Sequence, residues 1–138
     1  AIAEYHKLFA SGLPQKVSTY LKERLFETAA RHDCVGDVRG KGHFWGLEIV
    51  KNRETRAPFD VKADKLSGKA LMTGKISAAA MKKGLYVVAW YDTLTIAPPL
   101  IITEKQVDEA MAILDQALEI GDQEADKTGV AVSTSSEF

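Results

Sequence analysis

The stretch that decides the fold reads Val35-Gly36-Asp37-Val38-Arg39-Gly40-Lys41-Gly42-His43-Phe44-Trp45-Gly46-Leu47-Glu48-Ile49-Val50. It holds two apolar runs separated by a glycine-rich turn. In the second run every other residue is large and apolar (Trp45, Leu47, Ile49), which is the period of a strand half buried against helices. The glycines of the turn can take the positive φ values that a tight turn requires. The stretch therefore predicts a β-hairpin.

Helical periodicity lies on both sides of this hairpin. Apolar residues at helical spacing predict an amphipathic helix from Leu13 to about His32. A second helix is expected from a start within residues 65–74 to Lys83, with Gly84 just past its end. Thr103-Glu104-Lys105-Gln106 matches the capping box and predicts a third helix that continues to about Glu124.

Two further strands are expected between the second and third helices. Residues 85–90 and 93–97 are rich in β-formers, and Tyr91-Asp92 forms the turn between them. Pro98-Pro99 cannot donate to a sheet ladder, so the last strand ends there. The predicted order is α-β-β-α-β-β-α, an α+β (two-layer) fold in which helices pack on one face of a small, mostly antiparallel sheet of about four strands.

The composition predicts one domain in residues 1–125 and a disordered, small and polar tail in residues 126–138. A net charge of -1 favours neither nucleic acid nor an anionic membrane as a partner, and no apolar run is long enough to span a bilayer. The single cysteine, Cys34, cannot form an intramolecular disulfide, which fits a cytoplasmic protein. The chain begins without Met, as if within a helical pattern, and so reads as a fragment.

Few residues suggest chemistry by their spacing alone. The three histidines are far apart, which argues against a metal site. Cys34 beside His32 allows a nucleophile with a base, but a packed core cysteine is the favoured interpretation. The pattern Gly36-x-x-x-Gly40-x-Gly42 is better explained by hairpin geometry than by phosphate binding, because no strand precedes it and no helix follows it.

Three stretches, residues 35–48, 84–87 and 92–103, resemble the C-terminal part of class III pyridoxal-phosphate-dependent aminotransferases, in particular the ω-amino acid:pyruvate and taurine–pyruvate-like group. The resemblance implies the small domain of a fold-type-I enzyme that forms a homodimer. The parent enzyme would move an amino group from an ω-amino acid or amine to a 2-oxo acid such as pyruvate.

The same resemblance places the Schiff-base lysine, and the aspartate that faces the pyridinium nitrogen, in a large domain that is missing from this chain. The chain alone is therefore expected to be inactive and to bind no pyridoxal phosphate. The alternative function is a free-standing α+β binding module without catalysis.

The resemblance also implies a substrate pocket, at which this sequence departs from the family. Its members often hold the substrate carboxylate with an arginine at one of two positions, where this chain has Val88 and Thr95. We expect Val88, Trp90, Tyr91 and Thr95 to line a pocket for an amine or sulfonate, with plain strand packing as the alternative. Arg39 is a candidate substitute for the missing arginine, against a structural role in the hairpin.

Overall fold

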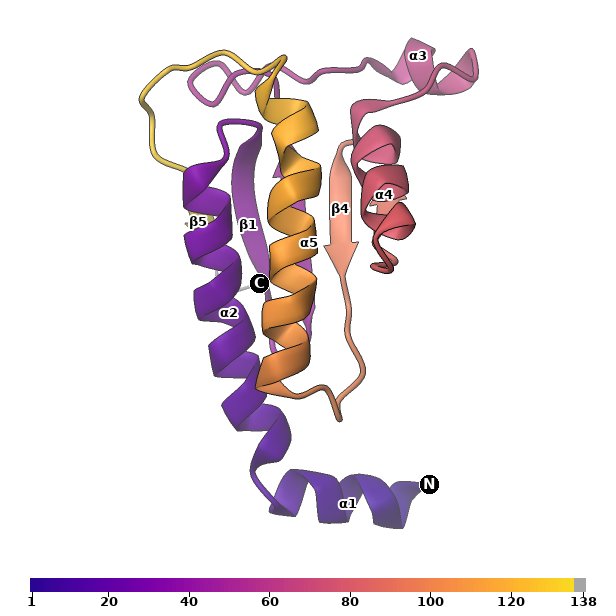
Figure 1. Cartoon of the computed structure of the whole chain (residues 1–138), viewed down its shortest axis with the longest axis vertical. Coiled ribbons are helices and arrows are strands. Elements are labelled where there is room, and N and C mark those ends of the chain that lie inside the picture. The colour runs from indigo at the N-terminus through magenta and orange to yellow at the C-terminus, as the bar shows by residue number, and fades with distance from the viewer. Residues whose placement is uncertain (136–138) are drawn as a thin grey trace.

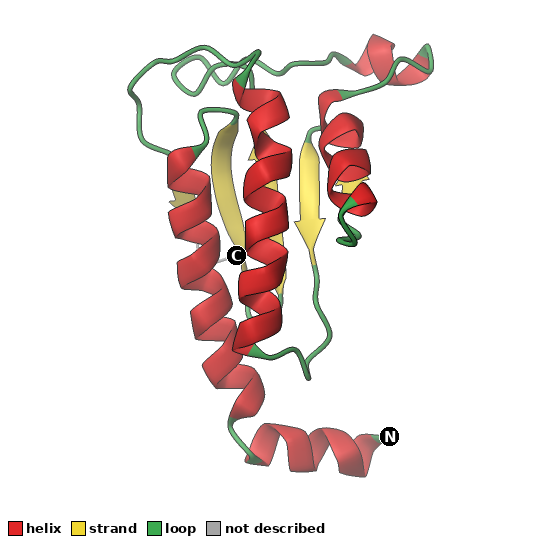
Figure 2. Cartoon of the chain, in the orientation of Figure 1, coloured by secondary structure: helices red, strands yellow, loops and turns green. Residues whose placement is uncertain are grey.

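The computed structural model of the protein describes residues 1–135 and has two layers. Helices α2 (Leu13–Arg31), α4 (Met72–Lys82) and α5 (Glu104–Asp122) lie side by side on one face of a sheet (Figures 1 and 2). Helix α1 (Ile2–Ala10) projects from the start of α2, and the short α3 (Lys62–Leu66) precedes α4. The predicted layer arrangement, with helices on one face, is confirmed. Within residues 1–135, no helix combines the length and apolar character that crossing a bilayer requires.

The sheet of the described residues has five strands in the order β3-β4-β2-β1-β5. They are β1 (Val35–Lys41), β2 (Phe44–Ile49), β3 (Val88–Trp90), β4 (Thr93–Ile96) and β5 (Ser133–Ser135). All neighbouring strands pair antiparallel except β1 and β5, which pair parallel. The predicted hairpin is the β1–β2 pair at the centre of this sheet.

Close contact inside the hairpin explains its glycines. Gly42 sits in the turn with a φ of 60°, a conformation that costs a residue with a Cβ free energy. A Cβ on Gly40 would lie 2.3 Å from the carbonyl oxygen of Phe44 and 2.7 Å from Trp45. The Trp45 indole fills that space and donates to the carbonyl of Gly42 at 2.9 Å. These glycines therefore serve the geometry of the hairpin, as the sequence predicts.

The core lies between the sheet and the helices. Trp45, Leu47 and Ile49 of β2 are buried there, as their alternation predicts. They face apolar residues of the helix layer. Full burial of each such side chain stabilises the fold by about 1.5–3 kcal/mol. The largest fully buried side chains of the three helices are Leu21, Leu25, Ile76, Leu114 and Leu118. Packing against the apolar face of the hairpin therefore fixes the position of the helices.

The first strand after α4 is shorter than predicted. Residues 85–87 belong to no strand, and two of their backbone groups bond to α4. The N–H of Leu85 donates to the carbonyl of Ala80 at 3.0 Å, and the Ser77 hydroxyl donates to the carbonyl of Val87. Only Val88–Trp90 is left to pair with β4.

The tail also differs from the expectation. Ser133–Ser135 pairs with β1 as β5, whereas residues 126–138 were expected to be disordered; residues 136–138 lie outside the described part. The N–H of Asp126 donates to the carbonyl of Lys51 at 2.7 Å, which turns the chain back along the sheet after α5. The helical pattern noted at the start of the chain is α1, for which no bounds were predicted, and the five-residue α3 was not predicted.

A buried arginine holds three segments together. Arg53 donates from Nε to the carbonyl of Val35 at 2.8 Å and from Nη1 to that of Val130 at 3.1 Å. Its Nη2 donates to the carbonyls of Ala29, at 2.8 Å, and His32. A cation at the C-terminal end of α2 satisfies carbonyls that have no partner within the helix and complements the helix dipole.

Candidate functional site

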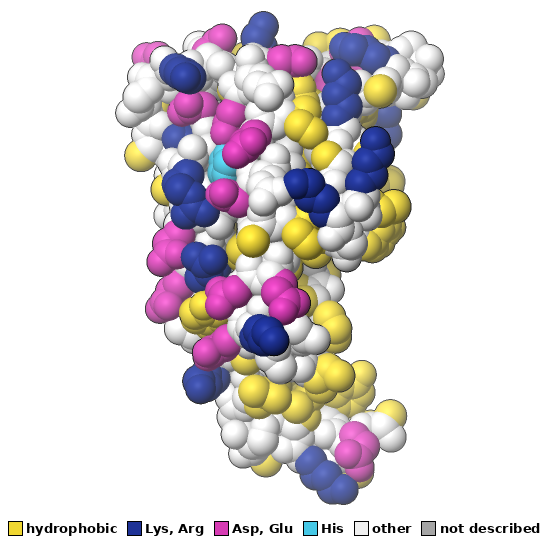
Figure 3. All heavy atoms as spheres, viewed as in Figure 1, with side chains coloured by type: hydrophobic (Ala, Val, Ile, Leu, Met, Phe, Trp, Pro, Cys, Tyr) yellow, Lys and Arg dark blue, Asp and Glu magenta, His cyan; other side chains and the backbone are white. Residues whose placement is uncertain are grey.

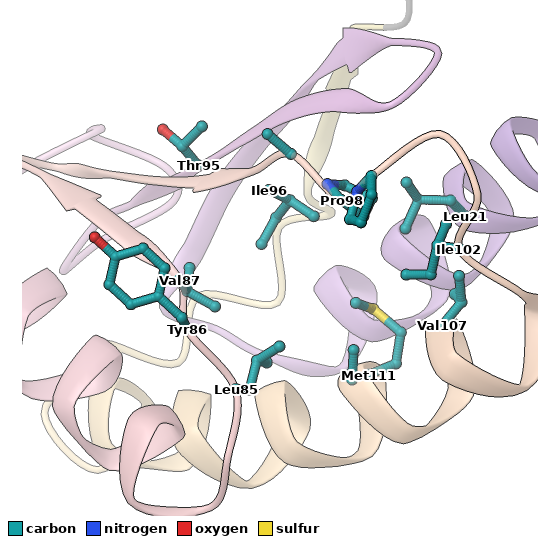
Figure 4. Close-up of a pocket in the computed structure, with 13 residues that line it drawn as sticks. Leu21, Leu85, Tyr86, Val87, Thr95, Ile96, Pro98, Ile102, Val107 and Met111 are labelled. Atoms are coloured by element: carbon teal, nitrogen blue, oxygen red, sulfur yellow. The ribbon is translucent and has the colours of Figure 1, made fainter. Parts of the chain in front are cut away.

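The face of the sheet opposite the helices carries the predicted pocket residues, and we call it the open face. Figure 4 shows Thr95 and Ile96 pointing to opposite sides of β4, Ile96 toward the helix layer. On β3, Val88 is 42% exposed and Trp90 69% exposed, while Ala89 between them packs against the core. Because strand side chains alternate, Val88, Trp90 and Thr95 share the open face.

Three of the five predicted residues lie in one row across this face. Val88 pairs with Thr95, Thr95 with Gly46, and Gly46 with Arg39. Neighbouring strands are about 4.8 Å apart, so Val88 and Thr95 are within side-chain contact of each other. Gly46 carries no side chain, which leaves a gap in the row between Thr95 and Arg39.

The pairing of Val88 with Thr95 brings together the two positions at which the resemblance implies a carboxylate-binding arginine. A guanidinium carried from either residue would reach the same part of the open face, because the two side chains are cross-strand neighbours. The sequence shows two candidates seven residues apart and does not show that they form one pair. In this chain both positions carry uncharged side chains with methyl groups, Val88 and Thr95.

Arg39 is engaged in a network of ion pairs. Its Nη1 lies 2.8 Å from Asp37 Oδ2 and 3.0 Å from Glu48 Oε2. Arg56 adds a second cation, with Nη2 3.1 Å from Glu48 Oε2. The charges of the two arginines and the two carboxylates cancel within this network. The geometry therefore favours the structural role for Arg39 over binding of a substrate carboxylate. One oxygen of this network, Oδ1 of the buried Asp37, has no hydrogen-bond partner among the described residues.

Trp90 and Tyr91 lie beside this row, at the turn between β3 and β4. Tyr91 has a positive φ of 55°, which is uncommon for a residue other than glycine. Its hydroxyl donates to the carbonyl of Asp60 at 3.0 Å, and its own carbonyl accepts from the Thr73 hydroxyl at 2.6 Å. The Tyr91 ring is therefore held between the loop before α3 and the start of α4.

A second polar cluster joins the end of α2 to α5. His32 Nδ1 lies 2.6 Å from Asp122 Oδ2, and its Nε2 lies 3.0 Å from Asp115 Oδ1. Burial disfavours the imidazolium, but hydrogen bonds to Asp122 and Asp115 outweigh it and raise the pKa of His32. Burial also opposes ionisation of Asp122, yet its bonds to His32 and Cys34 lower the pKa of this carboxyl. Both ring nitrogens are occupied, so His32 is poorly placed to act as a base.

Cys34 is part of the core. Its side chain is fully buried, and its thiol donates to the carbonyl of Leu118 at 3.4 Å. Burial raises the pKa of the Cys34 thiol well above its ordinary value, with the charge of Asp122 acting in the same direction. The interpretation as a packed core cysteine is confirmed.

A cavity of about 250 Å³ lies on the helix side of the sheet, where α5 approaches the segment after β4 (Figure 4). Its lining is apolar and includes Leu21, Val87, Ile96, Ile102 and Met111. Of the predicted pocket residues only Thr95 borders it. Without a charged or strongly basic group the cavity offers no acid–base chemistry.

The described residues do not fit the catalytic needs of pyridoxal phosphate. A Schiff-base lysine requires a desolvated amine, whereas every lysine in residues 1–135 is exposed except the partly buried Lys22. The buried charged or titratable side chains of this part are His32, Cys34, Asp37 and Arg53. These residues also contain no cluster of His, Cys, Asp and Glu suited to a metal ion.

Comparison with known proteins gives a consistent result. The family model described as aminotransferase class-III matches residues 8–118. The taurine–pyruvate aminotransferase of Bilophila wadsworthia is 38% identical over 103 residues, which are 74% of this chain and 22% of that enzyme. The alanine/serine racemase of Pyrococcus horikoshii is 32% identical over 120 residues, 85% of this chain and 22% of that enzyme.

Solved structures share the fold. A transaminase obtained by ancestral reconstruction superposes with a TM-score of 0.73 at 38% identity, over 88% of this chain and 25% of that one. The chain thus spans about a fifth to a quarter of the length of the proteins that it matches.

Proposed function

This chain belongs to the class III aminotransferases, and we propose from this premise that residues 1–125 form the C-terminal, substrate-closing domain of a pyridoxal-phosphate-dependent enzyme. The parent would transfer an amino group from an ω-amino acid or amine to a 2-oxo acid such as pyruvate. The observation that carries the proposal is the family match from α1 to α5, joined to the fold shared with a transaminase. The similarity to a taurine–pyruvate aminotransferase supports this choice of reaction.

The open face is the proposed substrate surface. Val88 and Thr95 form an uncharged pair where a guanidinium would grip a second carboxylate, and Arg39 is already neutralised by Asp37 and Glu48. This combination suits an amine or sulfonate that is not held by a bidentate arginine pair. Trp90 and Tyr91 would border the bound molecule at the end of the row.

The cofactor and its lysine would come from the large domain. Because the lysines of residues 1–135 are exposed or only partly buried, this chain would shape the substrate end of the site and exclude water from it. The proposal includes a homodimeric parent in the cytoplasm, in keeping with the family resemblance and with the reduced, buried Cys34.

Exposed apolar surface favours a docked domain over a free-standing module. Helix α1 exposes Ile2, Tyr5 and Phe9, and Ile101 lies beside it, 68% exposed. Figure 3 shows hydrophobic side chains gathered around this end of the molecule. A module that functions alone would be expected to cover such a patch.

Arginine substitution in the full-length parent tests the proposed pocket. Val88→Arg is expected to shift the preference among amine donors toward those with a second carboxylate, and Thr95→Arg to do the same, because the two residues are paired. We expect at least about tenfold in the ratio of kcat/KM values, the worth of one charge-assisted bidentate contact. Val88→Met controls for side-chain bulk. An unchanged preference in both arginine variants would refute the assignment of this surface.

A further inference from the structure

The side chain of Lys65 lies over an exposed aromatic ring. Its Nζ is 4.3 Å from the ring centroid of Trp90 and 5.9 Å from that of Tyr91. An ammonium group within about 6 Å of an aromatic centroid is attracted by the negative face of the ring. We propose that Trp90 and Tyr91 form a binding site for a small organic ammonium ion, which Lys65 fills as an internal ligand.

Charge around Lys65 supports this interpretation of the contact. The two nearby acids, Asp60 and Asp64, pair with Lys69, whose Nζ lies 3.2 Å and 3.5 Å from their carboxylates. Lys65 itself forms no salt bridge within residues 1–135, so the two rings are its electrostatic partners. Its neighbour Lys62 on α3 has neither ring contact nor ion pair in the same residues.

Contacts within the chain hold the backbone that carries the two rings. Tyr91 is held in its positive-φ conformation by bonds from its hydroxyl to Asp60 and from Thr73 to its carbonyl. A backbone held in such a conformation is maintained only where surrounding contacts outweigh its cost. The backbone of Trp90 is held by the pairing of β3 with β4, opposite Thr93, although its side chain is 69% exposed. Taking a cation therefore requires no rearrangement of the backbone that carries the two rings.

There is room for a small amine next to the rings. A hollow of about 280 Å³ lies between the aromatic pair and the start of α4, bordered by Leu71, Thr73 and Gly74. Lys65 enters it from α3, a helix of five residues with no buried side chain. A flexible side chain on an exposed helix can leave at little cost, so an external ammonium competes with it for one position.

Nuclear magnetic resonance of the 138-residue chain tests the site without cofactor or partner domain. Choline is the probe, and 3,3-dimethylbutan-1-ol is its uncharged isostere, both at constant ionic strength. The two indole N–H signals separate the sites, because Trp45 is buried in the core and serves as the internal reference. Choline is expected to shift the Trp90 signal at millimolar concentration, and the isostere to leave it in place.

Substitution of the internal ligand gives the sharper result. Lys65→Ala is expected to tighten choline binding about three- to sixfold, because an exposed cation–π contact of ordinary strength no longer competes. Lys62→Ala removes a charge from the same helix and is expected to leave the dissociation constant unchanged. Trp90→Leu removes the indole reporter, so its binding is followed by saturation transfer from the protein to the choline methyl signal, which wild type is expected to show and Trp90→Leu to lose.

Several results would overturn the proposal. Equal shifts with choline and with its isostere would show a hydrophobic contact without charge recognition. Equal dissociation constants for wild type and Lys65→Ala would show that Lys65 does not occupy the site. Absence of any choline-dependent shift of Trp90 in wild type and in Lys65→Ala would show that no ammonium site exists. Because the assay omits transamination, its failure leaves the proposed function untouched.

Discussion

Replacement of the buried Arg53 by methionine should destabilise the domain far more than the same replacement of its loop neighbour Arg56. Arg53 donates to the carbonyls of Ala29, His32, Val35 and Val130, which close the end of α2, the start of β1 and the tail. Methionine keeps the apolar stem but removes every donor. Removing one partner from a buried, charge-assisted network costs about 3–5 kcal/mol, because the remaining groups lose their bonds without regaining water.

Urea unfolding followed by far-ultraviolet circular dichroism measures this loss. A domain of this size has about 5–15 kcal/mol of stability, and the free energy changes by about 1–3 kcal/mol per molar urea. The midpoint should therefore fall by about 2 M at an unchanged slope. Arg53→Lys should recover little of the loss, since one ammonium cannot reach carbonyls that a planar guanidinium bridges.

The matched control is Arg56→Met in the same loop. Arg56 donates to the carbonyl of Gly36 at 2.7 Å and pairs with Glu48, but its side chain is 41% exposed. Water can replace those contacts, so we expect a loss of about 1 kcal/mol or less. The reasoning fails if Arg53→Met lies within about 1 kcal/mol of wild type, or if Arg53→Lys is as stable as wild type.

Four further outcomes are expected. Because the pKa of His32 is raised in the folded state, its stabilising contribution is full below about pH 6.5 and is lost as the pH rises through the raised value. The melting temperatures of wild type and His32→Asn should therefore converge as the pH rises above about 6.5. Thr103→Ala should cost about 1 kcal/mol in urea unfolding, since the Thr103 hydroxyl accepts from the N–H of Gln106 at 3.2 Å. Pyridoxal phosphate mixed with the chain should separate from it on gel filtration, and a cofactor absorbance band that persists in the protein peak would contradict the absence of a Schiff-base lysine. The isolated chain should self-associate in sedimentation velocity through the exposed apolar residues of α1, and Phe9→Ser should weaken this association; unchanged association would show that α1 does not contribute to it.

Local patterns predicted most of the regular elements. The alternation of Trp45, Leu47 and Ile49 is a property of neighbouring residues, and it identified both the strand and the face that it buries. The capping box could also be predicted, because its two hydrogen bonds join Thr103 and Gln106, which are three residues apart in the sequence. The final helix was expected to continue to about Glu124 and ends at Asp122. Such features need only sequence-local geometry, which composition and spacing express directly.

The elements that were missed depend on distant contacts or bury too little to leave a pattern. Strand β5 consists of small polar residues and exists because it pairs with β1, about a hundred residues earlier. Helix α3 has five residues and buries no side chain, so it has little periodicity to detect. Helix α1 does carry an apolar stripe with Ile2, Tyr5 and Phe9, but this stripe is exposed and packs against nothing in the described residues that would set its bounds. The strand before the last turn was predicted too long because residues 85–87 bond to α4 in place of the sheet.

The sequence by itself determined the hairpin, the three main helices, the two-layer architecture and the family, because these follow from periodicity and from motifs carried by adjacent residues. Only the tertiary structure decided what the candidate site is made of. Strand register made Val88 and Thr95 one cross-strand pair, and folding of the loop put Arg53 into the core. The approach of α3 placed Lys65 over Trp90. Register and long-range packing join residues whose separation in sequence carries no signal, so these contacts can be known only once the chain is folded.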